Sequence, residues 1–331
     1  SGSDSPLRIL LEVIEHNTVL SGDDVPDPLR LVQNLEYQFR DLNRLVQSSD
    51  KSPAPLDITI QHLNAVREYM MQIGSAAQSE EQALAIVRKR IQTAGAGDAV
   101  KTAEKEFTRL PAPVNHWLMP MVSFSLKQTI DTARSGLNNL WKNEVRAYYI
   151  AGLHDRYPLF KNSSNDATMD DFCRFFSANG IIHKFFQDHL KPFVDTSKSQ
   201  WRQVTMDSHS VVLAPSTLRQ FQRAEKIRKM FFSSGGPMPS VKFGLKPLDL
   251  DQRIDTFRLI IEGQTAEYRH GPTITQRFQW PGSQENSEVR LTLRTLKGRE
   301  MNLSWEGPWA FFRMLDDAVV ENAGTAERFI V

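Results

Sequence analysis

The chain has 331 residues, 40% of them hydrophobic, which predicts two or three folded domains and excludes wholesale disorder. Its 40 Lys and Arg residues balance 39 Asp and Glu residues, so the net charge of +1 gives no global attraction to nucleic acid or acidic lipid. No stretch of 18 apolar residues occurs, and we therefore expect neither a nucleic-acid partner nor a membrane span within these residues.

Residues 1–232 have the pattern of an all-α domain, because their apolar side chains recur at steps of three and four. One helix is predicted to begin after the N-cap residue Asp27, with Pro28 in its first turn. Its apolar face consists of Leu29, Val32, Leu35, Phe39, Leu42 and Val46. The segment 121–151 contains no Pro and only one Gly, so it is predicted to form the longest helix.

Two shorter helices are predicted in the segment DDFCRFFSANGIIHKFFQDHL. Thr168 and Asp171 have the spacing to cap the first, and the step from Asn179 to Gly180 is typical of a turn into the second. A last helix, STLRQFQRAEKIRKMFF, closes this half of the chain. A division of the helical domain into two subdomains, with a break near 150–168, is left open.

The pattern changes at residues 233–240, where SSGGPMPS is typical of a linker. From residue 241 the apolar residues recur at every second position. They are Val241, Phe243 and Leu245, then Phe257, Leu259 and Ile261, then Val289, Leu291 and Leu293, and finally Met301, Leu303 and Trp305. Half-buried strands at this spacing predict a small antiparallel β-sandwich over residues 241–331. The expected fold is therefore α+β, an all-α helical domain followed by a β-sandwich domain carrying one helix.

The stretch WEGPWAFFRML, residues 305–315, is dense in aromatic side chains. Trp305 has the same strand parity as Met301 and Leu303, so it is predicted to face the buried side of the sheet. After Gly307, with Pro308 at the first helical position, a helix is predicted to lie across that face. Its stripe is Trp309, Phe312, Leu315 and Val319. Burying each aromatic side chain removes about 150–250 Å² from water, enough to hold the helix on a sandwich.

Trp280 stands directly before a turn predicted at Pro281 and Gly282. Its indole therefore lies at the end of a strand, where two roles remain open. A core position would fill the sandwich, whereas an exposed position would offer a flat platform to a carbohydrate or a protein. The sequence favours the core.

A search for catalytic motifs favours a protein that is not an enzyme. The chain lacks the phosphate-binding motif GxxxxGK[ST] and the nucleophile motif GxSxG. Cys173 stands among phenylalanines, unlike a reactive thiolate, and His183 and His189 are six residues apart on a predicted helix, unlike metal ligands. We expect no catalytic residue, cofactor or metal. The acid pairs Asp170–Asp171 and Asp316–Asp317 keep a hydrolase open as an alternative.

Five ordered motifs in residues 140–331 resemble the C-terminal, periplasmic part of the IcmF/TssM family, inner-membrane components of type VI secretion systems. They are RYPLF at 156–160, DDFCRFFSANGIIHKFFQDHLKPFVD at 170–195, FRLIIEGQTAEYRHGP at 257–272, QWPG at 279–282 and GPWAFFRMLDDA at 307–318. Any one of them is a weak signal, but five in this order are specific.

The resemblance implies a structural and docking role in an envelope-spanning membrane complex. It implies that helices upstream of these residues anchor the protein in the inner membrane and that the present residues lie in the periplasm. It also implies binding to an outer-membrane lipoprotein of the TssJ type through the C-terminal β-domain. Further partners would be an inner-membrane protein of the TssL type and other copies of the chain itself.

The loops between the predicted strands hold the candidate contact residues. These are Tyr268, Arg269 and His270 in loop 263–272, Gln284, Glu285 and Asn286 in loop 281–288, and Lys297 and Arg299 in loop 296–300. Tyr and Arg are residue types enriched in interface hot spots. Two alternatives to protein docking remain. One is a periplasmic hydrolase that uses the two acid pairs on peptidoglycan, and the other is a carbohydrate-binding β-domain with Trp280 exposed.

Overall fold

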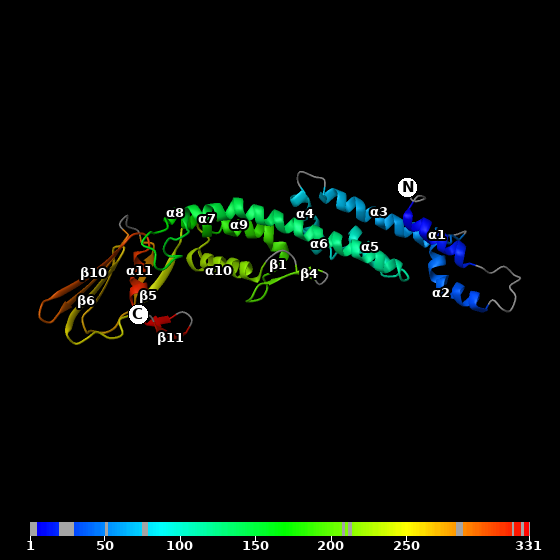
Figure 1. Cartoon of the computed structure of the whole chain (residues 1–331). Coiled ribbons are helices and arrows are strands. Elements are labelled where there is room, and N and C mark those ends of the chain that lie inside the picture. Colours follow the sequence, from blue (N-terminus) through cyan, green and yellow to red (C-terminus); the bar gives the residue numbers. More distant parts are fainter. Residues whose placement is uncertain are drawn as a thin grey trace. The chain divides into compact units, whose positions relative to one another are not determined.

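The computed structural model of the chain describes residues 5–19, 30–49, 52–74, 79–206, 209–210, 214–282, 287–319, 321–325 and 328–330 (Figure 1). The chain forms two compact units. The first contains residues 1–138 and 203–213, and the second contains 139–202 and 214–331. The predicted boundary at 232 falls within the second unit, which groups the later helices with the strands that follow residue 241. Short strands also occur between residues 194 and 210, in the part predicted to be all-α.

The first unit is built from helices. They are α1 (Pro6–Thr18), α2 (Arg30–Val46), α3 (Pro55–Gly74), α4 (Ser79–Gln92), α5 (Ala99–Phe107) and α6 (Val114–Leu140). Two short strands, β3 (Thr205–Met206) and β4 (His209–Ser210), pair with each other. Asp27 and Pro28, which were predicted to begin a helix, lie outside the described residues.

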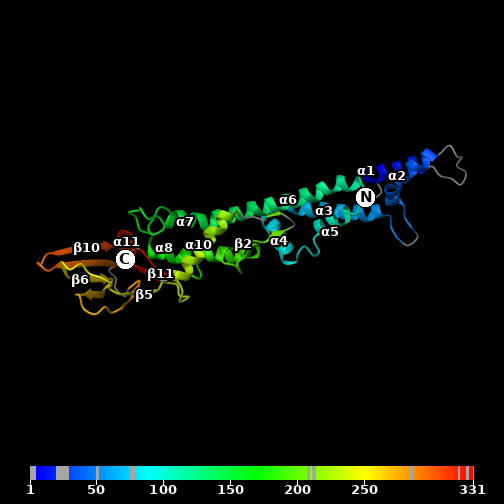
Figure 2. The same ribbon diagram turned by 90° about the horizontal axis from the view of Figure 1, so that it is seen from below.

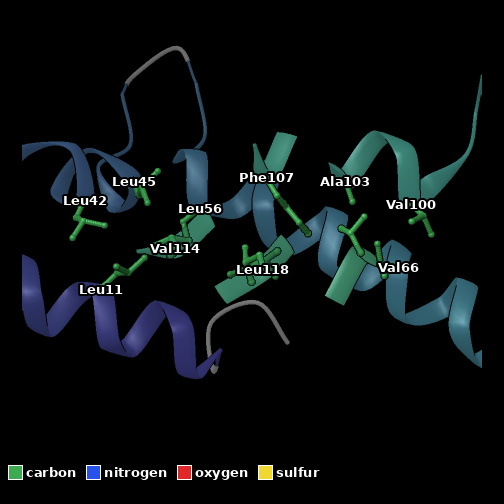
Figure 3. Close-up of a cluster of buried hydrophobic side chains, with 12 residues drawn as sticks. Leu11, Leu42, Leu45, Leu56, Val66, Val100, Ala103, Phe107, Val114 and Leu118 are labelled. Atoms are coloured by element: carbon green, nitrogen blue, oxygen red, sulfur yellow. The ribbon is translucent and has the colours of Figure 1, made fainter. Parts of the chain in front are cut away.

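The core of the first unit gathers apolar side chains from five helices, as Figure 3 shows. The spacing of Val100, Ala103 and Phe107 places all three on one face of α5, and each is fully buried. Val114 and Leu118 of α6 belong to the same cluster, one turn apart. On the predicted face of α2, Leu42 is buried in this cluster, and Phe39 and Val46 pack against it, so the periodicity found the correct face there.

The second unit begins with helical segments. These are the π-helical turn η3 (Trp141–Arg146), α7 (Ala147–Gly152), α8 (Met169–Phe176), α9 (Ile181–Phe185), the π-helical turn η4 (Phe186–Leu190), the 3₁₀ turn η5 (Lys191–Phe193) and α10 (Pro215–Phe231). The short strands β1 (Val194–Asp195) and β2 (Arg202–Gln203) form a two-stranded sheet. Helical residues run without a break from Val114 to Gly152, so the helix predicted over 121–151 begins earlier and includes Pro120.

The two short predicted helices are confirmed as α8 and α9. The Thr168 hydroxyl accepts a hydrogen bond from the Asp171 backbone N–H at 3.0 Å and thereby caps α8. The turn after α8 requires Gly180, because a Cβ there would lie 2.6 Å from the Phe175 carbonyl oxygen. Helices α8 and α10 lie side by side in both ribbon views (Figures 1 and 2).

The rest of the second unit is a β-domain with one helix. A four-stranded antiparallel sheet has the order β10-β9-β6-β7, and β5 pairs with β8 in a separate two-stranded sheet. The bounds are β5 (Val241–Leu245), β6 (Ile254–Ile261), β7 (Gln264–Tyr268), β8 (Gln276–Trp280), β9 (Glu288–Thr295), β10 (Glu300–Glu306), α11 (Ala310–Asp317), β11 (Glu321–Thr325) and β12 (Arg328–Ile330). The predicted fold class, helices followed by a small antiparallel β-domain, is confirmed.

The aromatic stretch joins the β-domain to the helices of the same unit. Trp309 is fully buried, and its ring centre lies 4.8 Å from that of Phe172 in α8 and 5.2 Å from that of Trp280 in β8. Its indole N–H donates to the Ala167 carbonyl at 2.7 Å. The prediction that Trp309 packs on the sandwich face is therefore incomplete, because half of its contacts come from the helical segments.

Two further details of this stretch differ from the prediction. The helix begins at Ala310, rather than at Pro308, and ends at Asp317, so Val319 lies beyond it and is 79% exposed. Phe311, outside the predicted stripe, is buried and stacks on Phe243 of β5 at 4.6 Å. The buried side of α11 therefore includes Phe311, which packs on β5, as well as Phe312, which packs on Trp280 of β8.

Polar groups reinforce this contact between the β-domain and the helical segments, which we call the junction. Arg313 of α11 pairs with Asp166, donates to the Ser163 carbonyl at 3.1 Å and lies over the Tyr157 ring at 4.1 Å. The Tyr157 hydroxyl donates to Asp316 at 2.8 Å, and together with burial this bond raises the pKa of Tyr157. The segment 157–166, which precedes α8, is thereby tied to the helix that follows β10.

Candidate protein-interaction site

One end of the four-stranded sheet faces away from the junction, and we call it the distal end. It consists of the end of β7 with residues 269–270 and of the turn 295–300 between β9 and β10. The register of β6 with β9 places Ile254 beside Thr295 at this end, whereas Trp305, at the other end of β10, bonds to Asp317 of α11. Candidate residues from two separate loops therefore lie at the same end of the sheet.

Tyr268, Arg269 and His270 reach the distal end from β7. Residues 264–268 were predicted as part of a loop, but they form β7, in which Tyr268 pairs with Phe257. The Arg269 guanidinium pairs with Glu267 at 2.7 Å. The His270 ring nitrogen Nε2 lies 2.6 Å from the Ile254 carbonyl oxygen, and its positive φ of 53° turns the chain away from the sheet. The distal loop is thus shorter than the sequence indicated.

Lys297 and Arg299 stand on the tight turn between β9 and β10. The Thr295 N–H donates to the Arg299 carbonyl at 2.8 Å, and Gly298 supplies the positive φ of 79° that this turn needs. Both cations are exposed, and neither forms a salt bridge within the described part of the chain. Leu296 beside them is 70% exposed. The turn therefore combines two positive charges with a solvent-exposed apolar side chain.

Gln284, Glu285 and Asn286 lie outside the described residues, but the residues that flank them belong to the opposite end of the sheet. The Glu262 carboxylate accepts a hydrogen bond from the Gly282 N–H, and the Glu262 N–H donates to the Glu288 carbonyl at 2.9 Å. Burial raises the pKa of Glu262, which is only 3% exposed. The described residues at the two ends of this loop, Gly282 and Glu288, therefore lie away from the distal end.

Trp280 is fully buried, at 0% exposure, and contacts Phe231 of α10 at 5.7 Å and Phe312 of α11 at 4.8 Å. The prediction that this indole belongs to the core is confirmed. An exposed platform for a carbohydrate is thereby contradicted at this residue.

The acid pairs form local contacts instead of a shared cleft. Asp170 pairs with Arg174 on the surface, and Asp171 accepts hydrogen bonds from Thr168 and Tyr148. Asp316 accepts from Tyr157, and Asp317 accepts from the Trp305 indole at 2.7 Å, while both residues are exposed on the helix surface. Each carboxylate is therefore accounted for by a structural contact.

Other chemistry-bearing groups are equally local. Burial raises the pKa of the Cys173 thiol to about 11, as expected for an inert cysteine. A small pocket between α9 and α10 is lined by His183, Glu225 and Arg228 among aromatic side chains. The Glu225 carboxylate accepts two hydrogen bonds from Arg228, at 2.6 and 2.8 Å, and so is already engaged. The described residues contain no group of three side chains placed to hold a metal ion.

Within the described residues, no helix combines the length and apolarity needed to cross a membrane. The longest, α6, has Lys, Asp and Arg residues along its exposed side.

Comparisons with known proteins match two consecutive segments of the chain to domains of one protein family. Residues 132–237 match the helical domain of the type VI secretion protein IcmF, and residues 243–331 match its C2-like domain. The type VI secretion system component TssM1 of Pseudomonas aeruginosa is 35% identical over 299 residues, which are 89% of this chain. The chain belongs to the IcmF/TssM family. It spans 26% of the length of that Pseudomonas relative.

Solved structures from type VI secretion membrane complexes, and one of a TssM domain, have a similar fold. A chain of a type VI secretion system membrane core complex aligns with 96% of this chain and 70% of its own length, with a TM-score of 0.71 at 18% identity. A chain of a type VI membrane complex aligns with 96% of this chain and 66% of its own, with a TM-score of 0.69 at 17% identity. The TssM C-terminal domain from EAEC aligns with 60% of this chain and 82% of its own, with a TM-score of 0.54 at 24% identity.

Sequence reasoning missed several residues that shape this site. Met301 and Leu303 were assigned to a buried face, but they are 52% and 44% exposed. The alternation in β10 is correct, since Trp305 alone of the three is partly covered, by α11. The missing signal was strand order, because the sequence does not show that β10 lies at the edge of the sheet.

Proposed function

We propose that this IcmF/TssM chain is a non-enzymatic structural and docking part of a type VI secretion membrane complex and acts in the periplasm. Its C-terminal β-domain binds an outer-membrane lipoprotein of the TssJ type. The distal end of the sheet carries this proposal, because it presents exposed contact residues on a frame that the junction holds rigid. Membership of the family supports a role in the membrane complex, and the absence of a shared acid cleft among the described residues favours docking over hydrolysis.

The turn 295–300 supplies the chemistry for docking. Lys297 and Arg299 can pair with carboxylates of the partner, while Leu296 can be buried at the centre of the contact. A stable complex of standard size buries about 800 Å² on each partner, more than one turn offers. Tyr268 and Arg269, at the same end of the sheet, extend the surface.

The helical segments have a second role in this proposal. They carry the β-domain and contact the other members of the complex, namely an inner-membrane protein of the TssL type and further copies of the chain. Support comes from the junction, in which Trp309 and Arg313 tie the β-domain to α8 and its preceding segment. A force applied to the β-domain is thereby passed to the helices.

The direct test is a calorimetric titration of the whole chain with the soluble part of the cognate lipoprotein. The whole chain is needed because residues 241–331 alone would expose Trp280 and Trp309, which pack on Phe231 and Phe172. We expect a single-site binding curve, and the double variant Lys297→Glu with Arg299→Glu should weaken binding about tenfold or more at low salt.

The matched control is Lys242→Glu, since Lys242 is an exposed cation of β5 in the same domain. It should bind like the unmodified chain. Absence of binding by the unmodified chain would refute the docking role, and equal weakening by both variants would show a general effect of charge.

A further inference from the structure

The outer edge of β10 is open. β10 is the last strand in the order β10-β9-β6-β7 and pairs with β9 from Glu300 to Glu306 without a shift in register. No strand pairs with its other side among the residues that the structure describes, and both ribbon views place β10 at the margin of the sheet (Figures 1 and 2). The backbone N–H and C=O groups on such an edge are free to pair with another extended chain.

β10 has few of the features by which proteins keep an edge strand unpaired, since its charged residues, Glu300 and Glu306, lie only at its two ends. Its sequence, EMNLSWE, contains no Pro and no Lys, and its seven residues form a regular strand with no bulge. The opposite edge, β7, has only five residues and is occupied at its start. There the Gln264 side chain exchanges hydrogen bonds of 2.7 and 2.9 Å with the Gln279 backbone of β8. Among the described residues, β10 is therefore the longer of the two edge strands, and the start of β7 is already engaged by β8.

The apolar rows of the sheet end uncovered at this edge. One row runs from Leu259 of β6 through Leu291 of β9 to Leu303 of β10. Exposure along it rises from 5% at Leu259 to 44% at Leu303. The next row ends at Met301, which is 52% exposed. One more strand beside β10 would extend both rows and cover these side chains.

The charges of β10 argue against a second copy of the chain as the occupant. In a full-length antiparallel pairing of two β10 strands, Leu303 would face its own copy at the centre. Glu300 would then face Glu306 of the other copy at both ends, and like charges directly opposite each other destabilise a strand pair. A different protein, with cations at these two places, avoids the repulsion.

We propose that β10 accepts an extended segment of the lipoprotein partner as a fifth strand of the sheet, an inference that rests on the proposed docking function. The segment alternates, with apolar side chains over Met301 and Leu303 and basic side chains near Glu300 and Glu306 on the other face. Backbone hydrogen bonds would provide affinity, and this alternation would provide specificity. The turn 295–300 lies at the start of the same strand, so both contacts belong to one surface.

The test combines hydrogen exchange with binding, and it uses the whole chain and the soluble lipoprotein. Amide exchange in residues 300–306 should slow on binding, while exchange in β7 should not change. The double variant Met301→Lys with Leu303→Lys places cations on the edge and should weaken binding about tenfold or more. Its control, Ile274→Lys, alters a side chain that is 70% exposed outside the four-stranded sheet and should leave binding unchanged.

A second variant is needed if the double variant Met301→Lys with Leu303→Lys does not fold. Glu306→Lys removes the like charge opposite Glu288 within the sheet, so it should fold normally. It should nevertheless weaken lipoprotein binding, and more so at low salt, because it faces the basic end of the added strand.

The outcomes separate the two proposals. If the unmodified chain does not bind the lipoprotein, the docking function fails. A ten-residue peptide of alternating Val and Lys then tests the edge of β10 directly. The strand-acceptor role is supported only if the unmodified chain binds this peptide and the double variant Met301→Lys with Leu303→Lys does not. If the lipoprotein binds but residues 300–306 gain no protection, or the edge variants bind normally, the strand-acceptor role is refuted while docking stands. Loss of self-association instead of lipoprotein binding would assign the edge to a second copy.

Discussion

The junction and the distal end of the β-domain contain the same kind of side chain in opposite surroundings. At the junction, Trp280 and Trp309 are fully buried between strands and helices. At the distal end, Leu296 and Met301 are more than half exposed, although Met301 lies on the same strand as the partly covered Trp305. The difference teaches that the alternation in a strand defines a face, while the neighbouring elements decide whether that face is core or contact surface.

The largest expected effect is at the junction. Trp309→Ala should lower the free energy of unfolding by about 3–5 kcal/mol, because it removes a buried aromatic side chain and leaves a cavity between α8, β8 and α11. It also leaves the Ala167 carbonyl without the indole donor. Denaturant unfolding followed by circular dichroism measures this loss.

The control for this variant is Trp305→Ala at the end of β10. Trp305 is only partly buried and its indole bonds to an exposed carboxylate, Asp317, so the expected loss is about 1–2 kcal/mol. Equal losses for the two tryptophans would contradict the distinction between the junction and the strand end.

A pair of glycines sharpens the comparison. Gly307 has a φ of 93°, and a Cβ there would lie 2.6 Å from Asp166 Oδ2, the partner of Arg313. Gly298 at the distal turn has a φ of 79° but open space around it. Gly298→Ala should therefore cost only the backbone strain, about 1–2 kcal/mol, whereas Gly307→Ala should cost at least about 1 kcal/mol more.

Thermal unfolding of both alanine variants measures this difference. Equal shifts of the unfolding midpoint would contradict this expectation. They would mean that the segment 157–166 moves aside at little cost in free energy, so that the polar contacts at the junction do not fix its position.

Local periodicity predicted most elements of this fold. The change of period at residue 241 separated helices from strands, and Thr168 and Gly180 marked the ends of α8 and its turn, since caps and turns depend on neighbours in sequence. The burial of Trp280 also followed from its size and strand position. These features need no knowledge of which elements lie together in space.

The errors arose where distant elements meet. Nothing near Trp309 in the sequence indicates that Phe172 and Ala167 lie beside it, about 140 residues earlier. Residues 264–268 were assigned to a polar loop that joins two strands, yet they pair with β6 as a strand of their own. The docking surface depends on strand order, so the sequence could name Lys297 and Arg299 but not the open edge beside them.

A smaller effect is expected from the buried carboxyl at the opposite end of the sheet. Burial raises the pKa of Glu262 above its ordinary value of 4.5, so the folded state binds a proton more tightly than the unfolded state. The contribution of this group to stability is complete below about pH 4.5 and is lost as the pH rises through the raised pKa. Glu262→Gln should therefore flatten the fall in stability above pH 4.5.

Unfolding measured at intervals between pH 4 and pH 8 tests this expectation. Glu267→Gln, at an exposed position of β7, is the control and should keep the pH profile of the unmodified chain. A profile that is the same in all three proteins would show that Glu262 ionises normally in the fold.

The smallest expected effect on stability is at the open edge, and it separates contact surface from core within a single row of leucines. Leu303→Ala should cost about 1 kcal/mol or less, since nearly half of this side chain is already in water. Leu259→Ala, two strands inward in the same row, should cost about 2–5 kcal/mol because Leu259 is only 5% exposed. If Leu303→Ala proves as costly as Leu259→Ala, the leucine of β10 is part of the core and the edge is closed. If Leu303→Ala hardly changes the free energy of unfolding yet weakens lipoprotein binding, this side chain contributes to the contact with the partner and not to the fold.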